Sequence, residues 1–163
     1  MSLTIRCASP SDASLIVDFI RQLGDYEKLL HEVEATEADL KASLFAPNPR
    51  VFCEIAEWAG EPAGFALWFY SYSTFLGRHG IYLEDLFVHE RFRGHGLGKS
   101  LLGHLAQRCI AENLGRLEWA VLDWNEPAIA FYEKQGAELR KQWIGCRLTG
   151  AALKTLAAGS ADI

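Results

Sequence analysis

Long hydrophobic runs are absent from this sequence, although half of its 163 residues are hydrophobic. No apolar stretch approaches the ~20 residues that a membrane-spanning helix needs. Residues 1–7 also lack the charged start and apolar centre of a secretory signal peptide. The sequence therefore predicts no membrane partner.

Paired cysteines are missing as well. The four cysteines, Cys7, Cys53, Cys109 and Cys146, are far apart and form no Cys-x-x-Cys pair. This spacing argues against a zinc site and against a disulfide framework. We therefore predict a cytoplasmic protein with reduced thiols and without a metal.

Positively charged residues are fewer than negatively charged ones. The sequence has 16 Lys and Arg residues and 21 Asp and Glu residues, which gives a formal net charge of −5. Proteins that bind nucleic acids through the phosphate backbone rely on clustered positive charge, so we predict no nucleic-acid partner. The acidic balance is compatible with a small cationic substrate, although many cytoplasmic proteins are equally acidic.

Strand-like and helix-like patterns alternate along the chain. Strand-like runs lie at about 4–8, 51–58, 63–72, 81–88, 117–122, 137–141 and 143–149. Capping signatures at Ser9, Thr36 and Asn125 mark helix starts, and apolar residues at four-residue spacing mark a helix over 97–109. This order predicts an α/β fold with a mixed sheet, in a single domain over residues 1–163.

The most informative segment is Arg91–Ser100, which reads Arg-Phe-Arg-Gly-His-Gly-Leu-Gly-Lys-Ser. Its glycines alternate between the strand-like run 81–88 and the helix that follows. Alternating glycines let successive backbone N–H groups point toward one anion, and the helix N-terminus adds partial positive charge. The segment therefore predicts a phosphate site, and a pyrophosphate site in particular.

Two familiar phosphate motifs fail here at a required position. The nucleoside-triphosphatase loop needs glycine where this chain has Arg93. The dinucleotide fingerprint needs glycine where this chain has Lys99. What remains is Arg93-x-x-Gly96-x-Gly98, which resembles the coenzyme A loop of the GNAT acetyltransferase superfamily.

Three segments carry this resemblance together, residues 83–88, 93–98 and 125–137, and it extends from Ile5 to about Leu156. The resemblance implies the GNAT fold, an α/β (α+β) arrangement with a mixed, mostly antiparallel sheet of six to seven strands flanked by helices. It also implies acetyl-CoA as cosubstrate, no metal, and a homodimer.

A narrower resemblance is to the diamine acetyltransferases, which include spermidine/spermine enzymes and thialysine-acetylating relatives. It rests on Leu23–Glu27, Tyr72–Phe75, Tyr82–Asp85 and Val121–Asn125. It implies that the acceptor is a primary amine of a small cationic metabolite: a diamine, a polyamine or a thialysine-like amino acid. Diamine enzymes commonly carry acidic residues where this chain reads Leu139-Arg-Lys-Gln142, so polyamine specificity stays open.

Acetyl transfer to an amine needs a base and an acid, because the amine arrives protonated, with a pKa near ~10, and the leaving thiolate needs a proton. The resemblance makes Glu84 the candidate base, acting directly or through a water, with an exposed strand carboxylate as the alternative. Asp85 is expected on the opposite strand face unless a bulge changes its direction. Tyr132, seven residues after Asn125, is the candidate acid, with core packing as the alternative.

The resemblance implies two kinds of contact with acetyl-CoA. The candidate cofactor-binding residues are Leu86, Phe87, Val88, Arg93, Gly94, Gly96, Gly98, Lys99 and Asn125. The first three are expected to run along the pantetheine arm, where a backbone N–H can stabilise an oxyanion. The loop residues are expected to hold the pyrophosphate through their amides. Arg91 and Lys134 are either outer phosphate contacts or solvated charges.

The candidate substrate-binding residues are Tyr26, Glu27, Glu84, Asp85 and Trp143. Glu27 is expected to pair with a distal ammonium, with an ordinary surface carboxylate as the alternative. Trp143 lines either the acceptor site or a dimer contact. Trp124 is interpreted as a packing residue.

Two further functions stay open. A protein or peptide N-acetyltransferase of the same class would need an open groove at the acceptor site. A non-catalytic acyl-CoA sensor would keep the fold without turnover. The presence of both Glu84 and Tyr132 counts against the sensor.

Overall fold

The computed structural model describes residues 2–159, of which those up to Asn125 form one compact unit and those from Glu126 onward form a second. The first unit holds the sheet, and the described part of the second holds helices α4 and α5. The single domain expected over residues 1–163 stays a prediction. Across residues 2–159, no helix combines the length and the apolar character that crossing a membrane requires.

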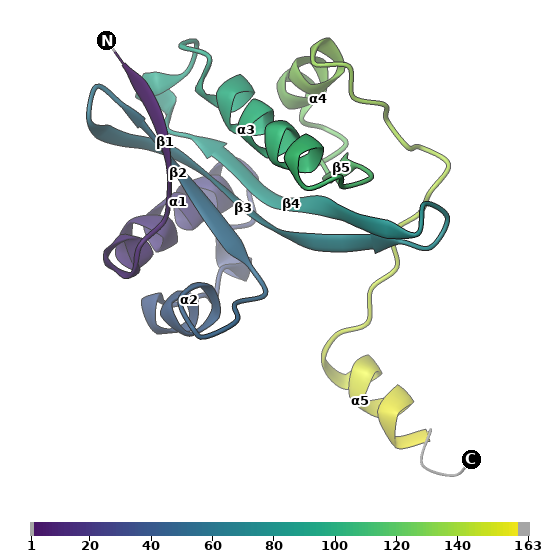
Figure 1. The fold of residues 1–163 in the computed structure, drawn as a ribbon. Helices are drawn as coiled ribbons and strands as arrows, with labels where there is room; N and C mark the ends of the chain where they lie inside the picture. The colour runs from purple at the N-terminus through teal and green to yellow at the C-terminus, as the bar shows by residue number, and fades with distance from the viewer. Residues whose placement is uncertain (1, 160–163) are drawn as a thin grey trace. The chain divides into compact units, whose positions relative to one another are not determined.

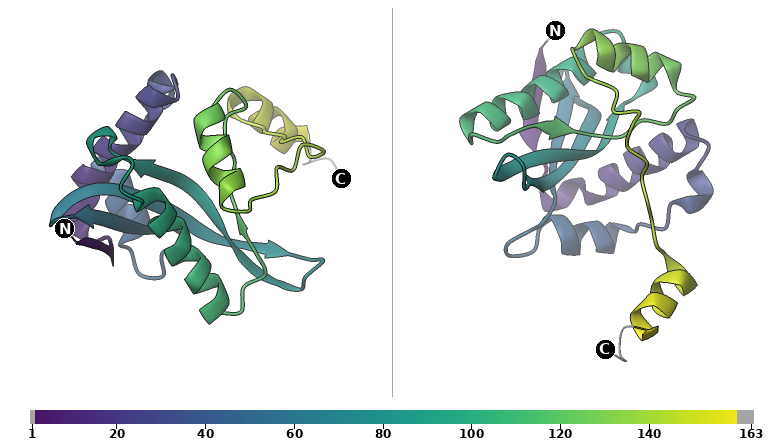
Figure 2. Two further views of the ribbon diagram at one scale, coloured as in Figure 1. Left: turned by 90° about the horizontal axis from the view of Figure 1, so that it is seen from above. Right: turned by 90° about the vertical axis from the view of Figure 1, so that its right-hand side faces the viewer.

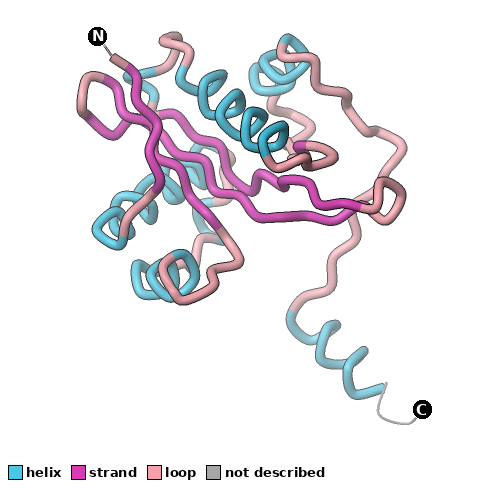
Figure 3. The backbone as a smooth tube through the Cα atoms, in the orientation of Figure 1, coloured by secondary structure: helices cyan, strands magenta, loops and turns pink. Residues whose placement is uncertain are grey.

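In the described chain the sheet has five strands in the order β1-β2-β3-β4-β5 (Figures 1 and 3). The strands are β1 (Leu3–Cys7), β2 (Phe52–Trp58), β3 (Glu61–Ser73), β4 (Arg78–Val88) and β5 (Leu117–Glu118). The first four pair antiparallel, and β5 joins β4 in parallel. The predicted α/β class with a mixed, mostly antiparallel sheet is confirmed.

The predicted count of six to seven strands is wrong for the described residues. Segments 137–141 and 143–149 contain no strand, and β5 ends at Glu118 instead of residue 122. Most side chains of residues 138–149 are exposed. A strand depends on its hydrogen-bonded neighbour more than on its own sequence. The strand-like pattern of these two segments therefore led to a predicted number of strands that was too high.

Helices cover both faces of the sheet in the first unit (Figure 2). Helices α1 (Ala13–Tyr26) and α2 (Glu37–Leu44) lie on one face, and α3 (Leu97–Ala111) lies on the other. Short 3-10 turns lie at η1 (Pro10–Asp12), η2 (Leu30–Glu32) and η3 (Glu90–Phe92). The predicted helix starts at Ser9 and Thr36 are confirmed by capping boxes at both positions.

The main apolar core lies between α1, α2 and the sheet. It consists of Ile16, Phe19, Leu40, Leu44, Cys53, Ile55, Phe65, Leu67 and Phe87. Phe19 is central, since its ring lies 5.7 Å from that of Phe65 and 5.6 Å from that of Phe87. Burial of one such aromatic side chain stabilises a fold by about 1.5–3 kcal/mol. This core fixes α1, and therefore the residues at its C-terminal end, against β4.

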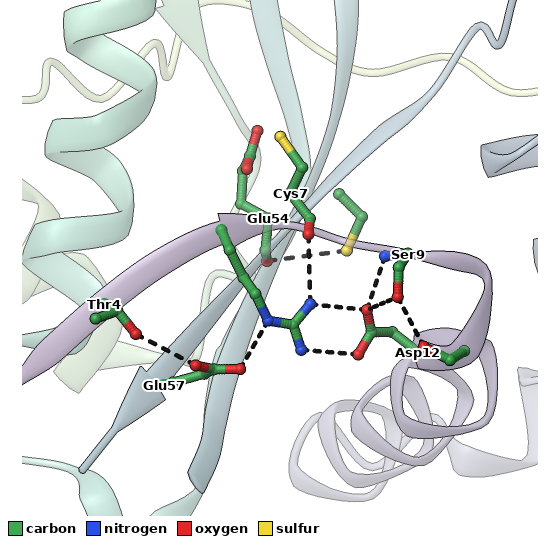
Figure 4. A network of polar contacts seen from close by, with 9 residues as sticks. Thr4, Cys7, Ser9, Asp12, Glu54 and Glu57 are labelled. Atoms are coloured by element: carbon green, nitrogen blue, oxygen red, sulfur yellow. Dashed lines mark hydrogen bonds and ion pairs between the residues drawn. The ribbon is translucent and has the colours of Figure 1, made fainter. Parts of the chain in front are cut away.

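A polar network ties β1 to the start of α1 (Figure 4). The Arg6 guanidinium donates to both carboxylate oxygens of Asp12, at 2.8 and 2.9 Å, and its Nε donates to Glu57 at 2.7 Å. Asp12 also accepts from the Ser9 backbone N–H at 2.7 Å, which completes the capping box. The Arg6 hydrogen bonds hold the pKa of Asp12 well below its usual range.

The second unit contains α4 (Glu126–Lys134) and α5 (Gly150–Gly159). Past the end of α4, the N–H groups of Gln135 and Ala137 donate to the Tyr132 carbonyl, at 2.9 and 3.1 Å. Gly136 lies between them with φ +90°, a left-handed conformation that favours glycine. The predicted helix from Asn125 to Gly136 therefore forms with nearly the expected ends.

Candidate active site

The glycine loop connects η3 to α3 in the first unit. Gly94 and Gly96 have φ values of +80° and +82°, and a Cβ added at either residue would meet no other atom within 4 Å. Ser100 N–H donates to the Gly96 carbonyl at 2.9 Å. The amides of residues 97–99 therefore precede the first intrahelical bond and are available to a ligand. The open space next to Gly94 and Gly96, together with the amides of residues 97–99, fits the pyrophosphate of acetyl-CoA.

The charged residues of this loop differ in how they are engaged. Arg93 turns back toward the sheet, where its Nε donates to the Val88 carbonyl at 3.1 Å. Arg91 forms an ion pair with Glu61 at 2.6 Å, so it already has a carboxylate partner. Lys99 is exposed beside the helix start. The head groups of Arg91 and Arg93 are thus both engaged with protein groups, whereas Lys99 is exposed next to the loop amides.

Strands β4 and β5 separate after Tyr82, before the chain reaches this loop. Their ladder joins Ile81 to Leu117 and Tyr82 to Glu118, and it ends there within the described residues. Beyond this point residues 83–88 keep β3 as a neighbour on one side. The other backbone edge is left for an extended ligand. This edge includes the three residues predicted along the pantetheine arm, and it fits such a chain.

A β-bulge lies in the middle of β4. Leu67 of β3 faces Asp85 and the next residue, Trp68, faces Leu83, so Glu84 is the extra residue of the bulge. Because cross-strand partners share a face, Asp85 lies on the same face as Leu67, which is the face that α1 covers. Asp85 shares this face with Phe87, as in a regular strand, whereas the bulge moves Leu83, opposite Trp68, to the other face.

Three carboxyl groups gather where α1 ends beside β4, and we call them the acidic cluster: Glu27, Glu84 and Asp85. Burial first, and then the charges of Glu84 and Glu27, raise the pKa of Asp85 to about 7. Burial also raises the pKa of Glu27. Asp85 therefore exchanges its proton near neutral pH, whereas Glu84 is exposed. Sequence reasoning missed this property of Asp85, because its burial and its closeness to Glu27 depend on tertiary packing and have no local signal.

Tyr26 connects the acidic cluster with the residues after β5. Its hydroxyl donates to Asn125 Oδ1 at 3.0 Å, and its ring lies 5.3 Å from the Arg93 guanidinium carbon and 6.3 Å from the Trp124 ring. Lys28 Nζ lies 5.0 Å from the centre of the Trp124 ring. Trp124, interpreted as a packing residue, has these two side chains against its ring, and 44% of its surface is exposed.

The first unit thus brings together most of the predicted site. The glycine loop, the free edge of β4, the acidic cluster, Tyr26 and Asn125 all belong to it. Tyr132 and Trp143 belong to the second unit, where Tyr132 is buried and Trp143 is 73% exposed. The roles of these two residues stay predictions.

An amide-lined loop, a split between parallel strands and a group of carboxylates are features expected of an acetyltransferase acting on amines. The family model described as "Acetyltransferase (GNAT) family" matches residues 17–137, and the chain belongs to this family. The resemblance inferred from sequence is confirmed, and the protein is an acetyltransferase enzyme.

Known relatives agree with this assignment. The chain is 35% identical to the thialysine N-epsilon-acetyltransferase of Mus musculus, over 96% of this chain and 98% of the relative. It is 34% identical to the L-ornithine N5-acetyltransferase NATA1 of Arabidopsis thaliana, over 93% of this chain and 86% of the relative. Among solved structures, an integron cassette protein from the mobile metagenome of V. cholerae superposes with a TM-score of 0.79 at 29% identity, covering 96% and 98% of the two chains.

Proposed function

We propose that this enzyme moves an acetyl group from acetyl-CoA to a primary amine of a small cationic metabolite, by direct attack within a ternary complex. The observation that carries the proposal is the acidic cluster at the open edge of β4, beside the glycine loop. Negative potential there attracts an ammonium group to the place where the thioester is expected. The thialysine and ornithine acceptors of the relatives belong to the same class of amine.

Acetyl-CoA would supply the acetyl thioester when bound, with its pyrophosphate at the amides of the loop and its pantetheine arm along residues 86–88. The attacking amine must lose a proton, and the acidic cluster receives it. Asp85 suits this role because its pKa of about 7 lies near working pH. Glu84, directly or through a water, is the second candidate. The new N–C bond forms as the C–S bond breaks, and Tyr132 donates a proton to the departing thiolate.

Glu27 is placed to select the acceptor. It lies at the C-terminal end of α1, and its charge raises the pKa of Asp85. A second ammonium group on the acceptor would find a counter-charge there. We therefore propose that acceptors with two cationic groups a short distance apart react best, and that long polyamines gain less because the segment near Arg140 and Lys141 is basic.

A homodimer is part of the proposal. Apolar side chains of the second unit are well exposed, among them Trp143 at 73%, Ile144 at 86% and Leu156 at 59%. A second copy of the chain would cover such a surface, and about 1,600 Å² of buried area is ordinary for a stable dimer. The four cysteines are all free thiols, which supports a reducing, cytoplasmic setting.

The proposal is tested by an amine panel with acetyl-CoA, followed by free thiol release. We expect kcat/KM for thialysine, ornithine and short diamines to exceed that for spermine at one ionic strength. Spermine as the best substrate would refute the selection by Glu27. No turnover with any small amine, together with acetyl-CoA binding, would favour a protein substrate or a non-catalytic sensor.

A further inference from the structure

One side chain of the glycine loop, that of His95, has no part in the proposed reaction. Its Nδ1 lies 3.0 Å from the Arg93 carbonyl oxygen and 3.2 Å from the Phe92 carbonyl oxygen. Because carbonyl oxygens only accept hydrogen bonds, Nδ1 must carry a hydrogen, which it donates to both. We call this contact the His95 bridge. It spans Gly94, the first of the two loop glycines with a left-handed backbone.

The two accepting carbonyls belong to a turn that hydrogen bonds already fix. Phe92 is buried at 8% exposure, and its N–H donates to the His89 carbonyl at 2.9 Å. The Arg93 N–H donates to the Glu90 carbonyl at 3.1 Å. Glycines, by contrast, have access to many backbone conformations. The His95 bridge therefore ties the freest part of the loop to the fixed end of η3.

The His95 ring also connects the loop to the sheet. It lies 4.8 Å from the Trp58 ring, between ring centres, with 49° between the ring planes. Trp58 faces Glu61 across the β2–β3 hairpin, and Glu61 forms the 2.6 Å ion pair with Arg91. One cross-strand pair thus contacts the chain at two points, just before the loop and within it. This double contact fixes the direction of the imidazole ring.

A loop that is held in its binding conformation binds a ligand more tightly. A free loop would lose backbone entropy on binding, and the apparent Kd rises as the competent conformation becomes less populated. The conformation also matters for α3, because the Ser100 N–H donates to the Gly96 carbonyl at 2.9 Å at the start of that helix.

We propose that His95 is a positioning residue for acetyl-CoA. Its Nδ1–H bridge holds the loop in the conformation that presents the amides of residues 97–99 to the pyrophosphate. This inference rests on the proposed function, because it needs acetyl-CoA at the loop. The competing role is a direct contact between Nε2 and a phosphate, and the two roles use different nitrogens of the same ring.

NMR of nitrogen-labelled histidine in the free enzyme tests the bridge without acetyl-CoA. At about pH 8.5 imidazole rings are neutral, and the nitrogen shifts distinguish the two tautomers. We expect the ring signals that His95→Asn removes to show the Nδ1–H tautomer. His89 is the internal reference, because its Nδ1 accepts from the Arg91 N–H at 3.3 Å and the ring therefore carries its hydrogen on Nε2.

Calorimetry with acetyl-CoA then tests positioning. The side-chain amide of asparagine can place an N–H where His95 has Nδ1, whereas glutamine places its amide near the position of Nε2. His95→Asn should keep the Kd within about twofold of the parent, and His95→Gln should raise it about fivefold, the ratio that one typical hydrogen bond gives. His95→Ala should behave like His95→Gln. His31→Gln, at an exposed histidine of η2, is the matched control and should change nothing.

Four results would overturn the proposal: an Nε2–H tautomer at His95, an unchanged Kd in both His95→Gln and His95→Ala, equal losses in His95→Asn and His95→Gln, or a loss in His95→Asn alone. The last result would assign a direct phosphate contact to Nε2. A parent enzyme that does not bind acetyl-CoA would refute the cofactor site itself. A parent that binds it, with the wrong order of variants, would refute only the role of His95.

Discussion

The Tyr26 hydroxyl donates a 3.0 Å hydrogen bond to Asn125 Oδ1, although 99 residues separate the two along the chain. The bond joins the last turn of α1, next to the acidic cluster, to the residue that follows the β5 segment. Asn125 is buried at 6% exposure, so its amide oxygen has limited access to water. The hydrogen bond therefore joins a residue predicted on the acceptor side of the site to one predicted on its cofactor side.

Removal of this link should weaken both the fold and cofactor binding. Tyr26→Phe is expected to lower the free energy of unfolding by about 1 kcal/mol, the net worth of a typical hydrogen bond. It should also raise the Kd for acetyl-CoA several-fold, because Asn125 loses its restraint. Urea unfolding and calorimetry measure the two effects. Tyr72→Phe, at a 55% exposed tyrosine, is the control, and equal behaviour of the two variants would refute the link.

The glycine loop gives a second prediction. Gly96→Val is expected to weaken acetyl-CoA binding strongly, because valine is strained at φ +82° and its side chain enters the space reserved for the pyrophosphate. Gly103→Ala is the matched control within α3, since its Cβ meets no atom within 4 Å and its φ is not positive. It should bind acetyl-CoA normally and gain about 0.5–1 kcal/mol of stability. An unchanged affinity in folded Gly96→Val would show that the loop does not hold the cofactor.

The acidic cluster makes the two candidate bases distinguishable by pH. With Asp85 as base, kcat/KM should rise through about pH 7, where its carboxyl loses the proton. Glu84→Gln removes a like charge, so the pKa of Asp85 should fall. The rise of kcat/KM with pH should then occur at lower pH than in the parent.

With Glu84 itself as base, the same Glu84→Gln variant should have a lower kcat/KM near neutral pH. Its activity should rise only at higher pH, where more of the amine is already deprotonated. Asp85→Asn completes the test, because it should abolish the limb of the kcat/KM profile near pH 7 in the first case and keep most of the activity in the second. The measurement is the kcat/KM profile of the parent and both variants with one amine.

The N-terminal network predicts acid sensitivity. The folded-state pKa of Asp12 lies below its unfolded value, so its contribution is present above about pH 4 and is lost as the pH falls further. Asp12→Asn should cost about 1–2 kcal/mol at pH 7, a discounted figure because the Arg6 side chain is 38% exposed. The difference from the parent should shrink toward pH 3 in urea unfolding. Asp39→Asn, at the exposed capping box of Thr36, should cost less at pH 7; an equal loss would contradict the prediction.

The acid role of Tyr132 gives a kinetic prediction. Tyr132→Phe keeps the ring and removes the hydroxyl, so acetyl-CoA affinity should hold while kcat falls by about 100- to 10,000-fold. Phe131→Leu, at the neighbouring ring of α4, serves as a packing control. A Tyr132→Phe enzyme with unchanged kcat across pH would remove the residue from the chemistry.

The sequence by itself determined the local features of this protein. Gly94 and Gly96 adopt the left-handed conformations that their residue type allows, and α3 follows at once. Capping boxes form at Ser9, where η1 leads directly into α1, and at Thr36 before α2, as predicted. These features depend on residues within one or two turns of each other, so the sequence pattern carries them.

The tertiary structure alone decided the electrostatics of the site. The register between β3 and β4 pairs Asp85 with Leu67, and this pairing places Asp85 on the face covered by α1. The pKa of Asp85 then depends on burial and on Glu27, which comes from another element. Likewise, the strand-like sequence pattern over residues 137–149 predicted strands, but the structure has none there. Strand pairing, burial and charge coupling join residues distant in sequence, and no local pattern specifies them.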